Sequence, residues 1–148
     1  MTFGFKKAAI VGLLVIGVAL SACTAKKDMS NASLYERLGG LGAITGVVDK
    51  FVANVAADER INKRFAKANI SRLKIRLVQQ ICEASGGPCK YQGQPMDVAH
   101  KGMKINEAEF NAMGEDLAKA LDDSGVAAKE KNELLAAIGS MQGEIVGK

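Results

Sequence analysis

The sequence predicts an all-α fold for a single domain that begins near residue 33. Apolar residues beyond that point recur at the i, i+3, i+4 spacing of an amphipathic helix. Only two prolines occur in 148 residues, and no segment shows the strict apolar-polar alternation of a half-buried strand. About 115 residues follow residue 33, which is enough for one domain with a modest core.

The first predicted helix is short and lies in the stretch SLYERL. Ser33 is followed three residues later by Glu36, which is the spacing of a capping box, and the Gly-Gly pair at 39–40 ends the helix. A longer helix is predicted from Ala43 to about Asp58, because its apolar positions share one face. These positions are Ile44, Val47, Val48, Phe51, Val52 and Val55.

A third helix is predicted from about Ser71, as its N-cap, to the Gly-Gly-Pro stretch at 86–88. Residues 88–95 carry no convincing period and are predicted to be irregular. A short helix is expected from Met96 to about Gly102. The residues that share one side of the third helix are Leu73, Leu77, Gln80 and Ile81.

Two longer helices are predicted to close the chain. The first lies in NEAEFNAMGEDLAKALDDSG and ends at Gly125, and the second lies in AKEKNELLAAIGSMQGEIVG. Both have an apolar face that needs a partner to cover it. The inward positions are Phe110, Met113, Leu117 and Leu121 in the first, and Leu134, Leu135, Ile138, Met141 and Ile145 in the second.

The N-terminus has the pattern of a secretory signal. Lys6 and Lys7 precede the apolar run AAIVGLLVIGVAL, which is shorter than the roughly 20 residues of a membrane-spanning helix. The following LSAC resembles the lipobox of bacterial lipoproteins, which implies removal of residues 1–22 and a lipid on Cys23. Residues 23–32 then read as the lipidated cysteine and a flexible tether. An ordinary secreted protein with an accidental Cys23 is the alternative.

This pattern predicts a protein of the bacterial cell envelope that faces the periplasm, lipid-anchored in the inner or outer membrane. Loss of Lys6 and Lys7 leaves 18 basic and 16 acidic residues, so net charge does not indicate a nucleic-acid partner. No run of basic residues is interleaved with aromatics either. We therefore expect no nucleic-acid binding.

Cys82 and Cys89 are predicted to form a disulfide. In an oxidising compartment two nearby cysteines are more often bridged than reduced, and EASGGP between them can turn tightly enough. The closed loop would stabilise the fold by about 2.5 kcal/mol in the chain-entropy model. Two free thiols are the alternative. The sequence has no C-x-x-C-H haem attachment site.

The mature chain resembles the group I truncated haemoglobins. The resemblance runs from about Ser33 to Val146 and depends on SLYERLGGLGAI, FAKANISRLK and YQGQPMDVAHKGMKI, with Gly-Gly pairs at 39–40 and 86–87 at near-constant spacing. It implies a truncated globin fold, a two-over-two helical sandwich around haem b. The irregular residues 88–95 agree with the mostly unwound proximal loop of that family.

By this resemblance His100, the only histidine, is the proximal haem iron ligand, since haem iron is held by a proximal His throughout the globins. A surface histidine on a short helix is the alternative. Phe65 corresponds to the aromatic residue that packs on the haem. Arg76 and Tyr91 lie where the family places groups that meet the haem propionates, and Met96 is expected to pack on the proximal side.

The distal side departs from the family pattern. Val52 stands where many members have a tyrosine that donates to bound oxygen, and Leu73 and Leu77 stand at other haem-facing distal positions. The predicted pocket is therefore apolar. Gln80 shares the face of Leu73 and Leu77 and is the one candidate distal donor; otherwise it is a polar rim residue. Loss of one such hydrogen bond, about 1.5–3 kcal/mol, weakens oxygen binding roughly ten- to a hundredfold.

The sequence thus predicts a membrane-anchored haem b protein that binds oxygen, nitric oxide or carbon monoxide at iron, and not primarily an enzyme. A nitric oxide-detoxifying or peroxidase-like haem enzyme is the second hypothesis, but no distal acid or base is visible for it. A haem-free, globin-like sensory or interaction lipoprotein is the third. A haem cleft and a plain apolar core look alike in sequence.

Overall fold

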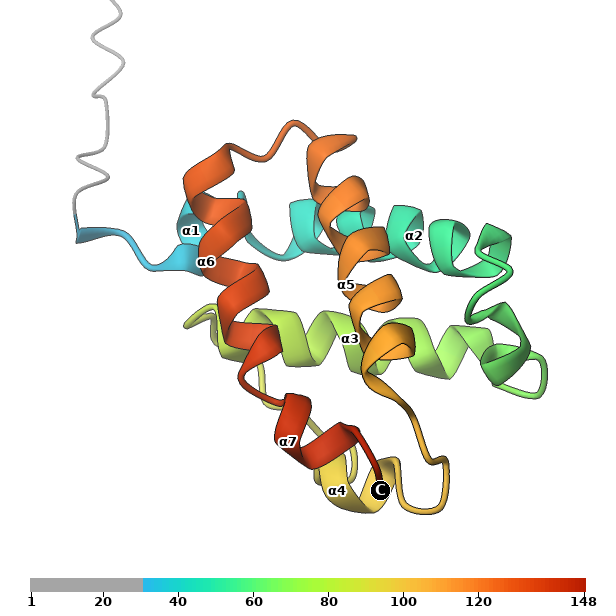
Figure 1. Cartoon of the computed structure of the whole chain (residues 1–148). Coiled ribbons are helices and arrows are strands. Elements are labelled where there is room, and N and C mark those ends of the chain that lie inside the picture. Colours follow the sequence, from blue (N-terminus) through green and yellow to red (C-terminus); the bar gives the residue numbers. More distant parts are fainter. Residues whose placement is uncertain (1–30) are drawn as a thin grey trace, which may run out of the picture.

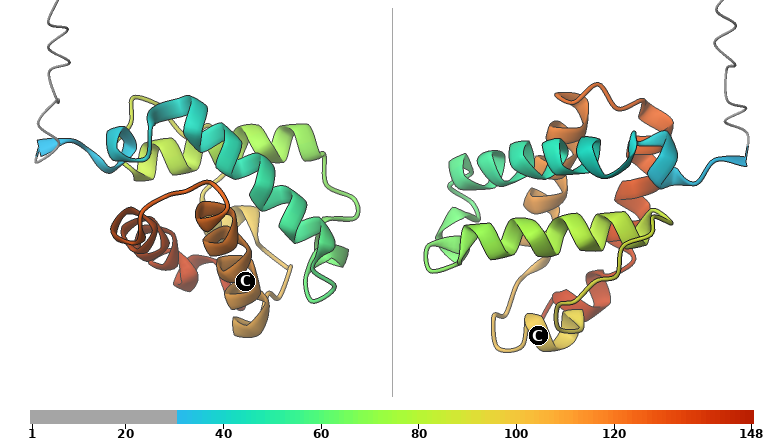
Figure 2. Two further views of the ribbon diagram at one scale, coloured as in Figure 1. Left: turned by 90° about the horizontal axis from the view of Figure 1, so that it is seen from above. Right: turned by 180° about the vertical axis from the view of Figure 1, so that it is seen from behind.

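The computed structural model describes residues 31–148, and within them the predicted all-α fold is confirmed (Figure 1). The predicted signal, the lipidated Cys23 and most of the tether lie outside the described residues. Two antiparallel helix pairs cross each other in the views of Figure 2. One pair is α2 and α3, and the other is α5 and α6. The bounds are α1 Leu34–Arg37, α2 Gly40–Ala57, η2 Asn62–Phe65, α3 Ile70–Ala84, α4 Met96–Ala99, α5 Glu107–Asp122, α6 Ala128–Gly139 and α7 Gln142–Ile145.

Local signals explain most helix starts. Ser33 and Glu36 form the predicted capping box of α1, and Asn106 and Glu109 form another at the start of α5. The N-cap of α3 is Asn69, whose side chain accepts from the Arg72 N–H, so the predicted cap at Ser71 is wrong by two residues. Asn is as good an N-cap as Ser, so the first of the two cap residues starts the helix.

Two predicted helices end earlier in the structure than periodicity suggested. The helix that begins at Met96 ends at Ala99, where α4 completes a single turn, and Gly102 follows with a φ of +80°. The predicted final helix is broken at Ser140 and Met141 into α6 and α7. This break turns α7 across the end of the molecule that holds α4 (Figure 1), where Ile145 is buried.

Two apolar clusters fill the described domain. The larger one packs α2 against α3, α5 and α6, with Ile44, Leu121 and Leu134 almost fully buried. The smaller one surrounds Met96 and Ile145 near α4 and α7. Among the described helices only α2 is long and apolar enough to cross a membrane, and its buried face packs in the larger cluster as that of a core helix does.

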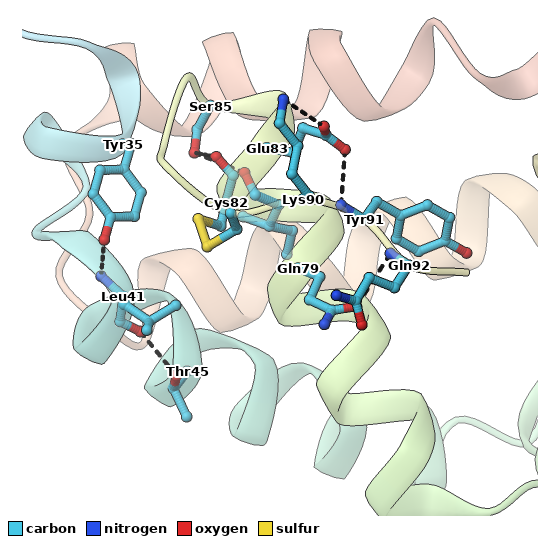
Figure 3. The surroundings of a disulfide bond; sticks show 12 residues. Tyr35, Leu41, Thr45, Gln79, Cys82, Glu83, Ser85, Lys90, Tyr91 and Gln92 are labelled. Atoms are coloured by element: carbon cyan, nitrogen blue, oxygen red, sulfur yellow. Dashed lines mark hydrogen bonds and ion pairs between the residues drawn. A yellow bond between two sulfur atoms is a disulfide. The ribbon is translucent and has the colours of Figure 1, made fainter. Parts of the chain in front are cut away.

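A disulfide between Cys82 and Cys89 joins the end of α3 to the irregular segment 88–95, with Cα atoms 5.7 Å apart (Figure 3). Gly87 turns tightly under this bond: its N–H donates to the Cys82 carbonyl at 2.7 Å. A Cβ at Gly87 would lie only 2.5 Å from the Tyr35 ring and 2.7 Å from that carbonyl. The close approach explains why glycine is needed at this position.

The C-terminal segment holds the loop that follows α4. Ile105 and Val146 form a parallel bridge, and the Gly147 N–H donates to the Ile105 carbonyl at 2.8 Å. The Lys104 N–H donates to the Lys148 carbonyl at 2.7 Å, with Lys104 in the left-handed region at a φ of +50°. The short helix α4 is therefore braced through α7 and the chain end.

Candidate functional site

A cavity of about 650 Å³ lies between α2 and α3 on one side and α4, α5 and α7 on the other. Its volume falls within the range of about 300–1,000 Å³ that is typical of cofactor and ligand pockets. Most of its lining is apolar, as expected for such a pocket. The structure brings all the predicted pocket residues to this one cavity: Val52, Phe65, Leu73, Arg76, Leu77, Gln80, Tyr91, Met96 and His100.

His100 is held in a defined orientation at the wall formed by α4. The residue is the C-cap of that helix, half-buried, and its Nδ1 lies 2.8 Å from the Met96 carbonyl oxygen. A carbonyl can only accept, so Nδ1 carries the proton and the Nε2 lone pair is left free. Histidines that bind metals commonly have this arrangement, with the second ring nitrogen bonded to a backbone carbonyl.

The wall opposite α4 offers no polar group from the three residues predicted to form it. Val52 projects from α2, and Leu73 and Leu77 project from α3, one helical turn apart. All three are half-buried and line the cavity. A ligand beside them would meet methyl groups and no hydrogen-bond donor.

Gln80 lines the cavity, but its side-chain amide contacts two methionine sulfurs and is not available beside Val52, Leu73 and Leu77. Nε2 is 3.3 Å from the Met96 sulfur and 3.2 Å from the Met141 sulfur. Thioethers are weak acceptors, so these contacts are modest. They direct the amide from α3 toward the side of the cavity that carries His100. This placement differs from the predicted distal position of the Gln80 side chain.

The mouth of the cavity carries the two predicted propionate partners. Arg76 donates from Nη1 to the Gln79 side-chain oxygen at 2.9 Å, and the Gln92 N–H donates to the same oxygen at 3.4 Å, so Tyr91 lines the cavity at the same edge. The Tyr91 N–H donates to Glu83 at 3.0 Å, and this bond, with Lys90, lowers the pKa of the Glu83 carboxyl. Figure 3 shows Tyr91 leaving the disulfide-linked segment beside α3.

Two features of the site were missed from the sequence. Arg64 forms a bidentate ion pair with Glu109, at 2.8 and 2.9 Å, and donates from Nη1 to the Met103 carbonyl at 2.7 Å. The backbone N–H of Asn106 and the Arg64 guanidinium lower the pKa of Glu109. This pair closes one edge of the cavity next to Phe65. The only signal was the adjacency of Arg64 to Phe65, because Glu109 is 45 residues away.

The second missed feature is the gathering of methionine side chains around the cavity. All four methionines of residues 31–148 line the cavity: Met96, Met103, Met113 and Met141. Met96 was predicted to pack on the proximal side, and Met113 and Met141 were expected only as plain core, so the gathering of all four was not foreseen. Methionine is flexible and polarizable, so it can fill the irregular space around a large planar group.

The described residues contain no cluster of three or more His, Cys, Asp or Glu side chains that could hold a metal ion. A single imidazole in an apolar cavity can bind iron firmly only when the other ligands come with the metal. A porphyrin supplies four nitrogen ligands in one plane, so the residues present fit haem and not a bare ion.

Comparisons with known proteins agree with this geometry. The family model for bacterial-like globins matches residues 33–146. A group 1 truncated haemoglobin, GlbN, from Mycolicibacterium paratuberculosis is 39% identical over 114 residues, which cover 77% of this chain and 84% of the relative. GlbN from Nostoc is 31% identical over 79% of this chain and 99% of its own length.

Solved structures show the same likeness. The truncated haemoglobin of Tetrahymena pyriformis in the Fe(III) form is 33% identical, with a TM-score of 0.76 over 78% of this chain and 99% of that one. The 2/2 haemoglobin of a Synechococcus, solved in the cyanomet state with covalently attached haem, is 32% identical with a TM-score of 0.70. It aligns with 75% of this chain and 94% of its own.

Proposed function

The chain belongs to the group 1 truncated haemoglobins of the bacterial-like globin family, and from this membership we propose that it is a membrane-anchored haem b protein with His100 as the iron ligand. Binding of a diatomic gas at haem is the general property of the family. The observation that carries the proposal is the orientation of His100, whose Nδ1 proton is directed to the Met96 carbonyl and whose Nε2 is free.

The residues around His100 suit a haem in three respects. The cavity is large and mostly apolar, Phe65 and the four methionines provide soft packing surfaces, and Arg76 lies at the mouth. An arginine there can make charge-assisted hydrogen bonds to a propionate carboxylate, and Tyr91 lies at the same edge. The haem would supply the iron at which the gas binds.

The apolar wall predicts which gases are favoured. Dioxygen gains partial negative charge when it binds ferrous haem, whereas carbon monoxide gains little. Val52, Leu73 and Leu77 cannot donate a hydrogen bond to that charge, which forgoes about 1.5–3 kcal/mol of oxygen affinity. We infer that the protein binds carbon monoxide or nitric oxide in preference to storing oxygen.

An enzymatic role has less support. A peroxidase-like reaction needs a group near the reacting atoms that transfers a proton, and the three residues of the apolar wall offer none. Nitric oxide detoxification by the oxygen-bound protein requires tight oxygen binding, which the same wall disfavours. For these two reasons we propose gas binding as the function in preference to an enzymatic reaction.

The proposed location depends on the lipoprotein pattern at Cys23 and on the disulfide of the structure, which belongs in an oxidising compartment. The test is labelling with radioactive palmitate in a bacterial host. Native protein should incorporate label and sediment with membranes, and Cys23→Ser should do neither. Equal labelling of both proteins would contradict lipidation at this residue.

The test of haem binding is the absorption spectrum of the purified mature protein. We expect a Soret band after addition of hemin and its loss in His100→Ala, while the neighbouring exposed change Lys101→Ala keeps it. A native protein that takes up no hemin would overturn the haem proposal. Laser photolysis of the gas-saturated ferrous protein then ranks oxygen against carbon monoxide.

A further inference from the structure

Charge is divided unevenly along the described chain. Residues 61–105 contain nine Lys and Arg but only two Asp and Glu. Residues 106–148 contain four basic and nine acidic residues, and residues 31–60 contain three and four. The near-neutral net charge of the described chain therefore combines a strongly basic segment, residues 61–105, with an acidic segment, residues 106–148.

The basic segment borders the cavity. Arg64, Arg72, Lys74 and Arg76 line the cavity itself. The bond from Arg64 to the Met103 carbonyl joins η2 to the loop after α4, so the lysines on both segments flank one edge. We call five exposed residues the basic rim. They are Lys63, Lys67, Arg72, Lys101 and Lys104.

No ion-pair partner balances the basic rim among residues 31–148. Two other cations that line the cavity are neutralised: Lys74 pairs with Asp49 at 2.7 Å, and Arg64 pairs with Glu109. The two propionates of a haem would offset only part of the remaining excess. A cleft with charge of one sign raises the local concentration of oppositely charged partners and their association rate.

Exposed apolar side chains lie within the same part of the chain. Of five large hydrophobic residues exposed in the described domain, four belong to residues 61–105. Ile70 and Met103 line the cavity mouth itself, at 41% and 47% exposure, and Val98 lies on α4. An apolar centre with a charged border is the anatomy of a protein interface, and complementary charge sets its partner.

We propose that the basic rim is the docking face for a small acidic one-electron carrier protein. The inference rests on the proposed haem function. Ferric haem gains one electron and the carrier loses one, and no bond is made or broken. Such a step restores the ferrous state that binding of oxygen or carbon monoxide requires. The cavity mouth is where the haem edge would come closest to a partner.

A protein fits this face better than the bilayer does. The described chain begins at α1, whereas η2 and the loop after α4 lie toward the other end of the molecule (Figures 1 and 2). With a lipid on Cys23, the membrane attachment is on the α1 side. The basic rim lies at the end of the domain farther from α1, where a soluble partner can reach it.

The first experiment maps the face without turnover. A plant-type ferredoxin serves as an acidic carrier probe, added in its oxidised form to ¹⁵N-labelled, carbon monoxide-saturated protein at low salt. We expect amide shifts in residues 61–76 and 98–105 that disappear in 0.5 M salt. Shifts centred on α1 or α6, or none at all, would overturn the proposal.

The second experiment measures electron transfer. Ferrous protein is oxidised by ferricyanide, an anion, or by tris-phenanthroline cobalt(III), a cation. We expect the ferricyanide rate at low ionic strength to fall about tenfold or more in K63E/K67E/K104E, and the cobalt rate to rise. The control K50E/K119E/K129E changes the same charge around the α5–α6 turn and should alter both rates by less than about twofold.

The outcomes separate the two proposals. A protein without a Soret band would contradict haem binding, whereas a haem-loaded protein with unchanged rates would contradict only the docking face. Equal effects in the two triple variants would also overturn it. Vesicles with 30% anionic lipid provide the last comparison: if K63E/K67E/K104E loses vesicle binding and keeps native rates, the basic rim faces a membrane and the proposal is wrong.

Discussion

The two walls of the cavity differ in how they are built and in what they do. The wall that carries His100 is assembled from short segments, a single helical turn, a loop and the chain end, and it has directed polar contacts. The wall formed by Val52, Leu73 and Leu77 belongs to two long helices, and these three side chains present only methyl groups. The first wall can hold a cofactor, and the second can only select a ligand by size and polarity.

The largest expected effect comes from removal of the imidazole. His100→Gly should lose its Soret band, because the remaining lining offers no ligand of comparable strength. Added imidazole should restore the band, since the cavity left behind matches the missing ring. Absorption spectra titrated with hemin, with and without imidazole, provide the measurement. Rescue would separate ligand loss from unfolding, and an unrescued but folded variant would contradict direct ligation.

The second-largest effect should come from adding a hydrogen-bond donor to the apolar wall formed by Val52, Leu73 and Leu77. Val52→Tyr places a hydroxyl on α2 near the ligand position, and we expect oxygen dissociation to slow roughly ten- to a hundredfold. Carbon monoxide dissociation should change far less. Val52→Phe is the matched control, because it adds the ring without the hydroxyl. Stopped-flow displacement of each gas gives the rates, and an equal effect of both variants would show that size alone matters.

The turn after α3 connects the helix of Leu73 and Leu77 to the segment that leads to His100, and a substitution at Gly87 should disrupt this turn. A Cβ there would meet the Tyr35 ring and the Cys82 carbonyl, so Gly87→Ala should destabilise the protein by about 1–3 kcal/mol. Gly46→Ala is the control, since a Cβ at this position in mid-α2 would have no neighbour within 4 Å, and alanine there should stabilise by about 0.5–1 kcal/mol. Urea unfolding monitored by circular dichroism measures both, and a neutral Gly87→Ala would contradict the tight turn.

The smallest effect concerns a group that touches neither wall. Asp116 is buried at the α2–α5 contact, and its Oδ2 has no hydrogen-bond partner in the described domain. Burial, and then the charge of Asp58, raise the pKa of Asp116. A raised folded-state pKa adds stability below the unfolded value of about 3.9, and this is lost as pH rises through the folded-state value.

Asp116→Asn should therefore stabilise the protein by about 1 kcal/mol at neutral pH, because a neutral amide costs less to bury than a carboxylate. The difference should shrink as the pH falls through the raised pKa of Asp116, because the native carboxyl then becomes protonated. Thermal unfolding at a series of pH values measures it. A constant difference across the series would contradict a charge effect.

Much of the fold and site could be predicted from the sequence because the signals were local. The Ser33–Glu36 cap, the glycine pairs and the periodic apolar faces each act over a few residues, and the structure has helices at those places. The pocket residues could be named because they recur at helical spacing around a family pattern. Because the chain has a single histidine, only one imidazole was available as the predicted iron ligand.

The features that could not be predicted from the sequence share a different cause, because each depends on contacts between distant segments. Periodicity continued the last helix through Ser140, whereas packing against α4 turns the chain there and forms α7. The Arg64–Glu109 pair joins η2 to α5, and the convergence of Gln80 with Met96 and Met141 joins three segments. Each contact depends on how distant elements approach one another.

The sequence by itself determined the helices, the lone imidazole and the absence of a donor at Val52, Leu73 and Leu77, because propensity, capping and residue chemistry belong to short stretches. Only the tertiary structure decided the direction of the Gln80 amide and the gathering of basic residues around one cavity. Those properties arise from distances between elements, and burial energy selects those distances over the whole chain at once.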